Sequence, residues 1–395
     1  MKIGILLSRF PYPLEKGDKL RAFHQIRELS KSNEIYLCAI STDKVKAEQL
    51  EKLKPYCSEI LIIKINKLSV LINLIYGLIF TKLPLQVAYF FKSSSKQRVQ
   101  NFFISHAVDH IYCQLIRVSE YVKDIKHIPK TLDYMDALSR GMERRHENAS
   151  IFLSPWIEVE TSRLKRYEHF IFSSFNEHTI ISEQDRDLIV HADNQEIEII
   201  RNGVDQEYFK PKETPKKYDL LFTGNMSYPP NIEGVCYLVE KVLPLIWKEN
   251  PQINLAIVGA NPSSKVLKLS SDKVFVSGWV DDMRIYYAMS RLFVAPMLIG
   301  TGLQNKLLEA MAMKVPCITT PLANNALQAE ANKSILIAND PKAFKDCVLN
   351  LLKYSALAND IALNGFNFVS REYSWANNTK KLEKIFTDSN QNRLQ

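Results

Sequence analysis

The chain has 395 residues, of which 46% are hydrophobic and 24% charged, and this composition excludes a disordered or fibrous protein. The length exceeds what one hydrophobic core usually serves, so two domains are expected. The formal net charge of +8 is spread along the chain instead of forming a basic block, so no nucleic-acid partner is expected.

The six cysteines are scattered, and none has the CxxC spacing of a metal site. Most lie in apolar runs, which is typical of buried thiols in a reducing compartment. The first residues, MKIGILLSRFPYP, contain too short an apolar run for a secretory signal and are predicted to form the first strand. We therefore expect a cytoplasmic protein.

Short β-branched runs alternate with helical patterns along the whole chain, which predicts two α/β domains with parallel sheets covered by helices on both faces. Ligands of such sheets bind beyond the carboxyl ends of the strands, so functional residues are expected in the loops that follow strands. The predicted strands are KIGILLS, EIYLCAI, EILIIKI, HIYCQLI, TLDYM, HTIIS and EIEII, then YDLLFTG, NLAIVG, KVFVSGW, RLFVAPM and PCITT.

Residues 67–83, KLSVLINLIYGLIFTKL, are mostly apolar but too few to span a bilayer. Two interpretations are open. The segment is either a buried helix of the first core or an interfacial helix on the cytoplasmic face of the inner membrane, with flanking lysines as anchors. In the second interpretation, Leu71, Ile75 and Leu78 contribute to the membrane-facing side.

Several polar residues of the first domain follow predicted strands or begin helices. Gly17 lies in the loop after the first strand, and Arg21 begins the next helix, where it binds a substrate or is a plain surface arginine. Gln114 and Arg117 follow a later strand and are weaker candidates for binding a substrate. Asp136 also follows a strand and is a candidate for binding a substrate hydroxyl, with helix capping as the alternative.

A charged, proline-containing stretch around Pro211 and Pro215 separates the two patterns. The first domain is expected at residues 1–210 and the second at 211–373. Residues 374–395 are predicted to hold a helix capped by Ser374 and a polar tail beyond Asp388 that frays.

Asp185 and Asp187 form an Asp-x-Asp pattern, but Ser182 three residues before Asp185 is typical of a helix start. No pattern in the sequence requires a metal ion or another cofactor.

The segment RLFVAPMLIGTGLQNKLLEAMAMKVPCITTP predicts a buried strand, a glycine loop, a helix beginning near Gln304 and a second buried strand. Its glycines allow close approach of a ligand, and a helix start favours a phosphate. Asn305 and Lys306 share one side of the helix with Glu309. Lys306 is suited to a diphosphate and Glu309 to ribose hydroxyls, and the alternative is a solvated Lys–Glu pair.

Four blocks of the sequence resemble glycosyltransferase family 4, a retaining family with the GT-B fold: FPYPLEKGDKLRAFHQIREL, RNGVDQEYF, FTGNMSYPPN and GLQNKLLEAMAM. Together they are similar to a bacterial sugar-transferase subgroup associated with exopolysaccharide clusters. The resemblance implies two Rossmann-like domains facing each other across a donor/acceptor cleft. It also implies transfer from a nucleotide-diphosphate sugar to a glycan or lipid-linked acceptor of capsule, exopolysaccharide or lipopolysaccharide synthesis.

The resemblance also suggests roles for individual residues. Glu309 matches the second glutamate of the family motif and is expected to bind the donor ribose, whereas Thr301 stands where the first glutamate is expected. Asn225 follows Gly224 where many members have a diphosphate-binding arginine. Lys306 is the first expected substitute, and Arg201 and the backbone amides near Gly302 are the alternatives. The expected donor-binding set is Gly17, Arg201, Gly224, Asn225, Gly300, Thr301, Gly302, Leu303, Asn305, Lys306 and Glu309, with Lys306 and Asp136 as catalytic candidates. Arg21, Gln114 and Arg117 are the weaker candidates for binding the acceptor, and Asp136 is expected to contact an acceptor or sugar hydroxyl.

Trp279 follows a strand of the second domain near the expected position of the base, with core packing as the alternative. Two other functions stay open at this point. One is a nucleotide-sugar epimerase of the same fold, which needs no acceptor. The other is a non-catalytic nucleotide-sugar binder, because Thr301 replaces the expected carboxylate.

Overall fold

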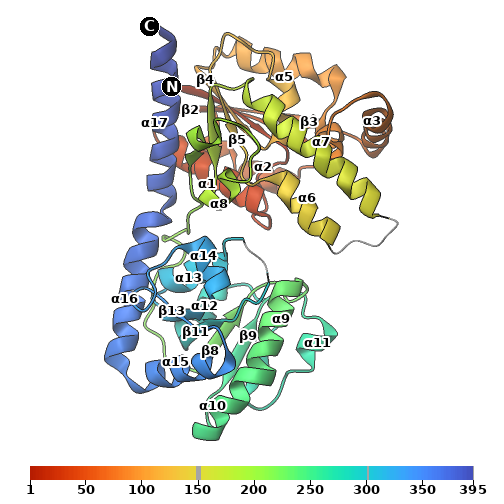
Figure 1. Cartoon of the computed structure of the whole chain (residues 1–395). Coiled ribbons are helices and arrows are strands. Elements are labelled where there is room, and N and C mark those ends of the chain that lie inside the picture. The colour runs from red at the N-terminus through yellow and green to blue at the C-terminus, as the bar shows by residue number, and fades with distance from the viewer. Residues whose placement is uncertain (148–152, 300–301, 395) are drawn as a thin grey trace. The chain divides into compact units, whose positions relative to one another are not determined.

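The computed structural model describes residues 1–147, 153–299 and 302–394 (Figure 1). The chain divides into two compact units, Met1–Asn202 with Trp375–Gln395, and Gly203–Ser374. The division lies at Asn202 instead of near residue 210, because Val204 already pairs with the end of the second unit. Its amide donates to the carbonyl of Tyr373 at 2.8 Å.

The first unit is built on a seven-stranded sheet in the order β3-β2-β1-β4-β5-β6-β7, with parallel pairing throughout. The order reverses between β1 and β4, which is where ligands of such sheets bind. The strands are β1 (Lys2–Leu7), β2 (Glu34–Ser41), β3 (Glu59–Lys64), β4 (His110–Gln114), β5 (Lys130–Asp133), β6 (Glu177–Ile180) and β7 (Glu198–Ile199). The helices are α1 (Gly17–Leu29), α2 (Ala47–Glu51), α3 (Lys67–Phe80), α4 (Leu85–Phe90), α5 (Ser93–Ser105), α6 (Leu138–Glu147), α7 (Ser154–Phe172), α8 (Glu183–Arg186) and α17 (Trp375–Leu394).

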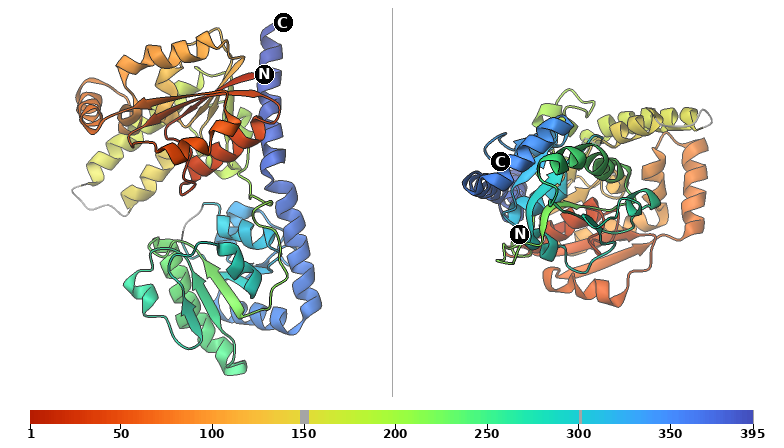
Figure 2. Two further views of the ribbon diagram at one scale, coloured as in Figure 1. Left: turned by 180° about the vertical axis from the view of Figure 1, so that it is seen from behind. Right: turned by 90° about the horizontal axis from the view of Figure 1, so that it is seen from below.

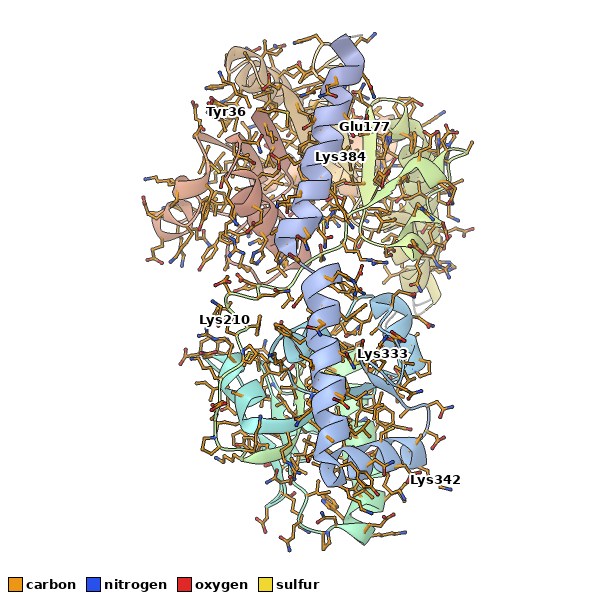
Figure 3. All side chains as sticks on the ribbon, turned by 90° about the vertical axis from the view of Figure 1, so that its left-hand side faces the viewer. Tyr36, Glu177, Lys210, Lys333, Lys342 and Lys384 are labelled. Atoms are coloured by element: carbon orange, nitrogen blue, oxygen red, sulfur yellow. The ribbon has the colours of Figure 1, made fainter. Side chains whose placement is uncertain are left out.

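Helix α17 belongs to the first unit although it is the last element of the chain. Leu382 and Phe386 are fully buried in the core beside β1 and α1, and the ring of His110 stacks on Phe386 at 4.5 Å. Figure 3 shows Lys384 on the opposite, exposed side of the helix. The expectation of a frayed tail beyond Asp388 is wrong, because the helix continues past this residue.

The burial of helix α3 bears on the two interpretations of residues 67–83, a buried core helix or an interfacial helix. Val70 and Gly77 are buried, whereas Leu71 and Ile75 are at least half exposed, so a fully buried helix is the wrong interpretation. Leu78 is partly buried, which makes its expected place on an exposed face wrong as well. None of the described helices is long and apolar enough to cross a membrane.

The second unit has a six-stranded parallel sheet in the order β10-β9-β8-β11-β12-β13, and its order reverses between β8 and β11 (Figure 2). The strands are β8 (Tyr218–Thr223), β9 (Leu255–Val258), β10 (Val274–Val276), β11 (Ser290–Ala295), β12 (Cys317–Thr319) and β13 (Leu336–Ile337). The helices are α9 (Pro229–Tyr237), α10 (Leu243–Glu249), α11 (Ser264–Leu267), α12 (Met283–Met289), α13 (Asn305–Ala312), α14 (Pro321–Leu327), α15 (Pro341–Lys353) and α16 (Ser355–Glu372).

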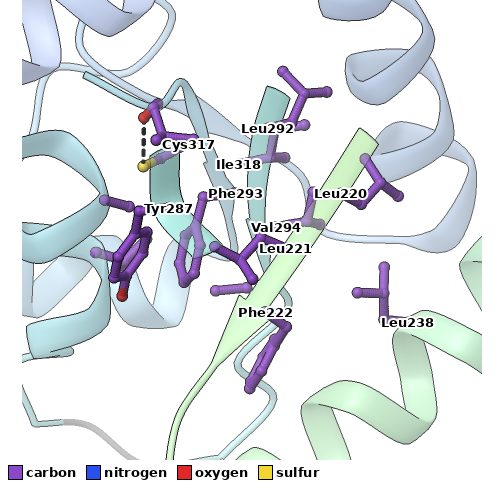
Figure 4. Close-up of a cluster of buried hydrophobic side chains, with 14 of the residues drawn as sticks. Leu220, Leu221, Phe222, Leu238, Tyr287, Leu292, Phe293, Val294, Cys317 and Ile318 are labelled. Carbon is purple, nitrogen blue, oxygen red and sulfur yellow. Dashed lines mark hydrogen bonds between the residues drawn. The ribbon is translucent and has the colours of Figure 1, made fainter. Parts of the chain in front are cut away.

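The centre of this sheet is tightly packed. Leu221 and Phe222 of β8 lie near Phe293 and Val294 of the neighbouring strand β11, and all four side chains are fully buried (Figure 4). Burying a large apolar side chain stabilises the fold by about 1.5–3 kcal/mol. The loops that follow β8 and β11 therefore start from a rigid base. The two predicted Rossmann-like units are confirmed.

Candidate active site

Strand β11, which precedes the predicted glycine loop in the sequence, lies where the order of the second sheet reverses. The loop after β11 leads into α13, whose first residue is Asn305. Gln304 at the N-cap provides no side-chain acceptor for the amides of the first turn, and such amides favour an anion. Gly300 and Thr301 lie outside the described residues, whereas Gly302 and Asn305 are exposed and the side chain of Leu303 packs against the core.

Lys306 is buried, with only 9% of its surface exposed. Its Nζ donates to Asn231 Oδ1, lies 3.6 Å from Met297 Sδ and sits 4.8 Å from the centroid of the Phe222 ring. Burial lowers the pKa of Lys306 to about 8, and the nearby charge of Glu309 opposes this shift. The alternative of a solvated Lys–Glu pair is therefore wrong: the ammonium is enclosed by neutral groups, a costly arrangement that a bound anion would relieve.

Glu309 is held by a chain of hydroxyl groups. Tyr287 is fully buried, and its hydroxyl donates to Glu309 Oε2 at 2.8 Å while lying 2.8 Å from Thr223 Oγ1. Burial raises the pKa of Glu309 to about 7, although the bond from Tyr287 and the charge of Lys306 favour ionisation. The ionised carboxylate accepts hydrogen bonds only, which suits it to a ligand with neighbouring hydroxyl groups.

The loops after β8 and β9 meet through their backbones. Gly259 has a φ of +147°, and a Cβ atom there would lie 1.8 Å from the carbonyl oxygen of Gly224. Gly224 has a φ of +152°, and a Cβ atom there would lie 2.6 Å from Asn231 Nδ2. Glycine at 259 therefore leaves room for the backbone of Gly224, and glycine at 224 leaves room for Asn231. The Asn231 side chain donates to the carbonyl of Asn225 at 2.9 Å. Asn225 itself is exposed, and its side chain accepts hydrogen bonds from Ser227.

Sequence reasoning missed Asn231 and Tyr287. Asn231 is the last residue of the block FTGNMSYPPN, and it lies in the first turn of α9 after two prolines, where a polar side chain can turn toward the strand ends. Tyr287 carries no signal, because it lies in an apolar helix. Trp279 is 70% exposed, so core packing is not its role.

Arg21 is not an acceptor ligand, and that prediction is wrong. Its side chain is fully buried, with Nε donating to Asp133 Oδ2 at 2.7 Å and Nη2 to Asp133 Oδ1 at 3.2 Å. Nη1 donates to the carbonyl of Ile200 at 2.8 Å and to Asn202 Oδ1 at 2.9 Å. The arginine therefore ties α1 to the end of β5 and to the last residues of the unit.

The other candidates of the first unit stay predictions. Gly17 is the first residue of α1 and is exposed. Gln114 is buried, so the Gln114 side chain is poorly placed to contact a ligand. Asp136 is exposed. Arg201 belongs to this unit as well, with Nη2 4.0 Å from Glu183 Oε1.

The Asp-x-Asp pattern belongs to a helix start. The Asp185 amide donates to Ser182 Oγ at 3.1 Å in the first turn of α8. Within residues 1–147, 153–299 and 302–394, no group of three or more His, Cys, Asp or Glu side chains is arranged to hold a metal ion.

Comparison with known proteins agrees with this geometry. Residues 217–354 match the profile of the family "Glycosyl transferases group 1". The matched residues lie within the second unit. A 44.6 kDa protein from the cps region of Klebsiella pneumoniae is 25% identical to the chain, covering 98% of it and 100% of the relative. The resemblance seen in the four sequence blocks is thereby confirmed.

Solved glycosyltransferase structures share the whole fold. A glycosyltransferase from Rickettsia africae superposes with a TM-score of 0.69 at 14% identity, covering 98% of each chain. Anabaena HepE, in complex with UDP and glucose, gives a TM-score of 0.66 at 13% identity, covering 98% of this chain and 100% of its own. The chain shares the GT-B fold of these glycosyltransferases, as predicted.

Proposed function

We propose that this glycosyltransferase moves a sugar from a nucleotide-diphosphate sugar to a glycan or lipid-linked acceptor, with retention of the anomeric configuration, in cell-surface polysaccharide synthesis. The observation that carries the proposal is the buried Lys306, placed one turn before Glu309 at the start of α13. The bound UDP of the HepE structure supports a nucleotide-diphosphate donor, and the cps-region relative supports a capsule-type product.

In this proposal the second unit binds the donor. The diphosphate lies at the start of α13, where the amides of the first turn and the Lys306 ammonium meet its charge. The ionised Glu309 accepts hydrogen bonds from the ribose hydroxyls, and Tyr287 fixes its orientation. Gly224 and Gly302 let the backbone approach the phosphates.

During transfer, the bond between the anomeric carbon and the diphosphate oxygen breaks as the acceptor oxygen bonds to the same face of that carbon. The acceptor proton moves to the departing diphosphate oxygen, and the nucleoside diphosphate leaves. The protein has to position the two substrates and stabilise the charge that develops on the leaving group. Lys306 supplies the positive charge that stabilises the leaving group, in place of the arginine absent at Asn225.

The donor charge is met by Lys306 and backbone amides, so we expect catalysis without a metal ion. Nucleoside diphosphate release should appear only when donor and acceptor are both present, and EDTA should leave its rate unchanged. Coupled detection of the diphosphate, with mass spectrometry of the glycosylated acceptor, measures both. Conversion of the donor without an acceptor would identify an epimerase, and binding without turnover a non-catalytic binder. Loss of activity in EDTA that magnesium restores would contradict the metal-free mechanism.

Replacing Glu309 with glutamine should stabilise the unliganded protein at pH 8. Because the pKa of Glu309 rises from 4.5 to about 7 on folding, the folded chain binds this proton more tightly, and stability falls as the pH rises between these values. Above pH 7 the ionised carboxylate costs about 1–3 kcal/mol, which a neutral amide avoids. Urea unfolding without nucleotide should show a gain at pH 8 that vanishes at pH 4, below both values.

The same variant should bind nucleoside diphosphates more weakly, by roughly 1–3 kcal/mol, because the ribose hydroxyls lose a charged acceptor. Isothermal titration at pH 8 measures this loss. Gln328→Glu directly after α14, an exposed change of equal size, serves as the control for the change in charge. Unchanged nucleotide affinity in folded Glu309→Gln would remove the ribose assignment.

We further propose that the enzyme works in the cytoplasm at the inner face of the membrane. The apolar segment at residues 67–83 supports this placement, because one face of α3 is exposed and apolar.

A further inference from the structure

Helix α3 exposes a continuous apolar stripe at the margin of the first unit, on the side away from α17 (Figure 1). The members of the stripe are three or four positions apart, so they share one face of the helix. Contiguous exposed apolar surface of this kind marks an interaction site. The main members, each between 50% and 70% exposed, are Leu68, Leu71, Ile72, Ile75, Ile79 and Phe80.

The opposite face of α3 fixes the helix to the rest of the first unit. A Cβ atom at Gly77 would lie 2.8 Å from the side chain of Ala88 on α4, so the two helices are in close contact there. Arg163 of α7 donates to the carbonyls of Gly77 and Leu78 at 2.9 and 3.0 Å. At the start of the helix, the side chain of Asn66 accepts an amide of the first turn at 2.7 Å. The helix is therefore anchored from its buried side, and the stripe takes no part in this attachment.

The sequence around α3 carries charge of one sign. No Asp or Glu occurs from Ile60 to Val108, whereas this segment contains six Lys and Arg residues, so it contributes six of the eight net positive charges of the chain. These residues are too far apart to form a basic block, but no carboxylate of the segment offsets them. Lys67 is the first residue of α3, Lys64 ends the preceding strand and Lys82 follows the helix, and all three are exposed. An apolar helix face flanked by lysines is typical of a helix at the surface of an anionic bilayer.

We infer that the α3 stripe docks on a bilayer surface rich in anionic lipid, with the helix lying in the plane of the interface. This inference rests on the proposed function for the membrane location, and it names the part of the chain and the lipid charge that hold the enzyme there. With 14 residues, α3 is too short to cross a bilayer. A second copy of the chain is a poorer occupant, because pairing two stripes would bring together two segments that carry positive charge and no carboxylate.

The apolar stripe and the lysines make separable contributions to this binding. The apolar contribution follows the area removed from water, whereas the attraction between lysines and lipid phosphates is screened by salt. Binding should therefore be tightest on anionic vesicles at low salt, and part of it should persist when the salt concentration is raised.

Sedimentation of the full chain with vesicles tests the contribution of charge. The wild type should bind vesicles of phosphatidylglycerol and phosphatidylethanolamine about tenfold more tightly than vesicles of phosphatidylcholine, and added salt should reduce this preference. Lys64→Gln with Lys67→Gln and Lys82→Gln should remove most of the preference. The control, which should leave the preference unchanged, is the same change at three exposed lysines of the second unit, Lys241, Lys248 and Lys342.

Serine in place of apolar residues tests the stripe itself. Leu71→Ser with Ile75→Ser and Ile79→Ser should weaken binding to the anionic vesicles about tenfold at low and at high salt, because apolar area is lost. The three side chains are exposed, so thermal unfolding should change little. The control, which should bind vesicles like the wild type, is the same change at three exposed leucines of the second unit, Leu267, Leu357 and Leu363.

Three results would overturn the inference. One is equal binding of the two vesicle types by the wild type, and another is undiminished vesicle binding by the folded triple serine variant. The third is a dimer in analytical ultracentrifugation that the triple serine variant dissociates, which would assign the stripe to a second copy of the chain.

Nucleoside diphosphate binding, measured by isothermal titration on the same variants, separates this inference from the proposed reaction. The substituted residues of α3 and its flanks lie outside the second unit, so nucleotide affinity should stay unchanged. If the chain binds anionic vesicles as expected but no nucleoside diphosphate, the proposed transferase reaction fails and the membrane surface stands. If nucleotides bind and vesicles do not, only the membrane surface fails.

Discussion

Lys306→Ala is expected to lower kcat by about 100- to 1,000-fold, comparable with the removal of a principal electrostatic stabiliser. The lysine is the one cation among the described residues that contacts Asn231 at the start of α9, and it stands one turn before Glu309. Stabilisation that grows as the diphosphate departs acts on kcat more than on the donor KM. Steady-state kinetics with saturating acceptor measure the two separately.

The pH profile sharpens this test. Because burial lowers the pKa of Lys306 to about 8, kcat/KM of the wild type should fall as the pH rises above this value and the ammonium loses its proton. Lys306→Arg should recover part of the activity and lose this alkaline limb, since a guanidinium stays charged. Lys333→Ala, at an exposed lysine paired with Glu330, is the matched control. A kcat near that of the wild type for folded Lys306→Ala would leave the backbone amides as the stabilising groups.

Arg21→Met is expected to destabilise the first unit by about 3–5 kcal/mol, because it leaves the buried Asp133 without its cation. Within the described part of the chain, the carboxylate would keep three neutral donors, namely the hydroxyl of Tyr112 at 2.7 Å, the hydroxyl of Thr179 at 3.1 Å and the amide of Met135 at 3.4 Å. Urea unfolding of the full chain, followed by hydrogen exchange in each unit, locates the loss.

A second substitution separates the missing charge from the missing packing. Arg21→Met combined with Asp133→Asn should recover part of the stability, since no uncompensated charge remains buried. Arg98→Met, at an exposed arginine of α5, should change stability by less than about 0.5 kcal/mol. If Arg21→Met were as stable as the wild type, the ion pair would carry no structural role, and a functional role for Arg21 would have to be reconsidered.

The elements of the fold were predictable because each buried strand is a local apolar run. Such runs as YDLLFTG and RLFVAPM form β8 and β11, and the glycine loop with its helix start follows β11 as expected. The strand β13 escaped prediction because only Leu336 and Ile337 form it. The sequence also did not predict that α17 packs on the first unit. The apolar residues of this helix indicate that one of its faces is buried, but they do not indicate which of the two units it packs against.

The candidate site also contains features that the sequence predicted and features that only the folded chain revealed. The spacing of Lys306 and Glu309 on one helix is a local property, and the sequence alone placed both residues at the end of a strand with a glycine loop before them. The partner of each came from elsewhere in the chain. Asn231 and Tyr287 are 75 and 22 residues away from the side chains they bind, so only the packing of β8, α9 and α12 brings them together.

For Arg21 the sequence left a surface role open, whereas the tertiary structure decided a buried one. No residue near Arg21 in the sequence predicts its ion pair with Asp133, which lies 112 residues further along the chain on β5. The sequence by itself determined the two parallel α/β units, the glycosyltransferase motif and the apolar character of α3, because helix and strand patterns arise from neighbouring residues. The tertiary structure decided which charges are buried and which face of α3 is exposed, because burial depends on contacts between segments distant in sequence.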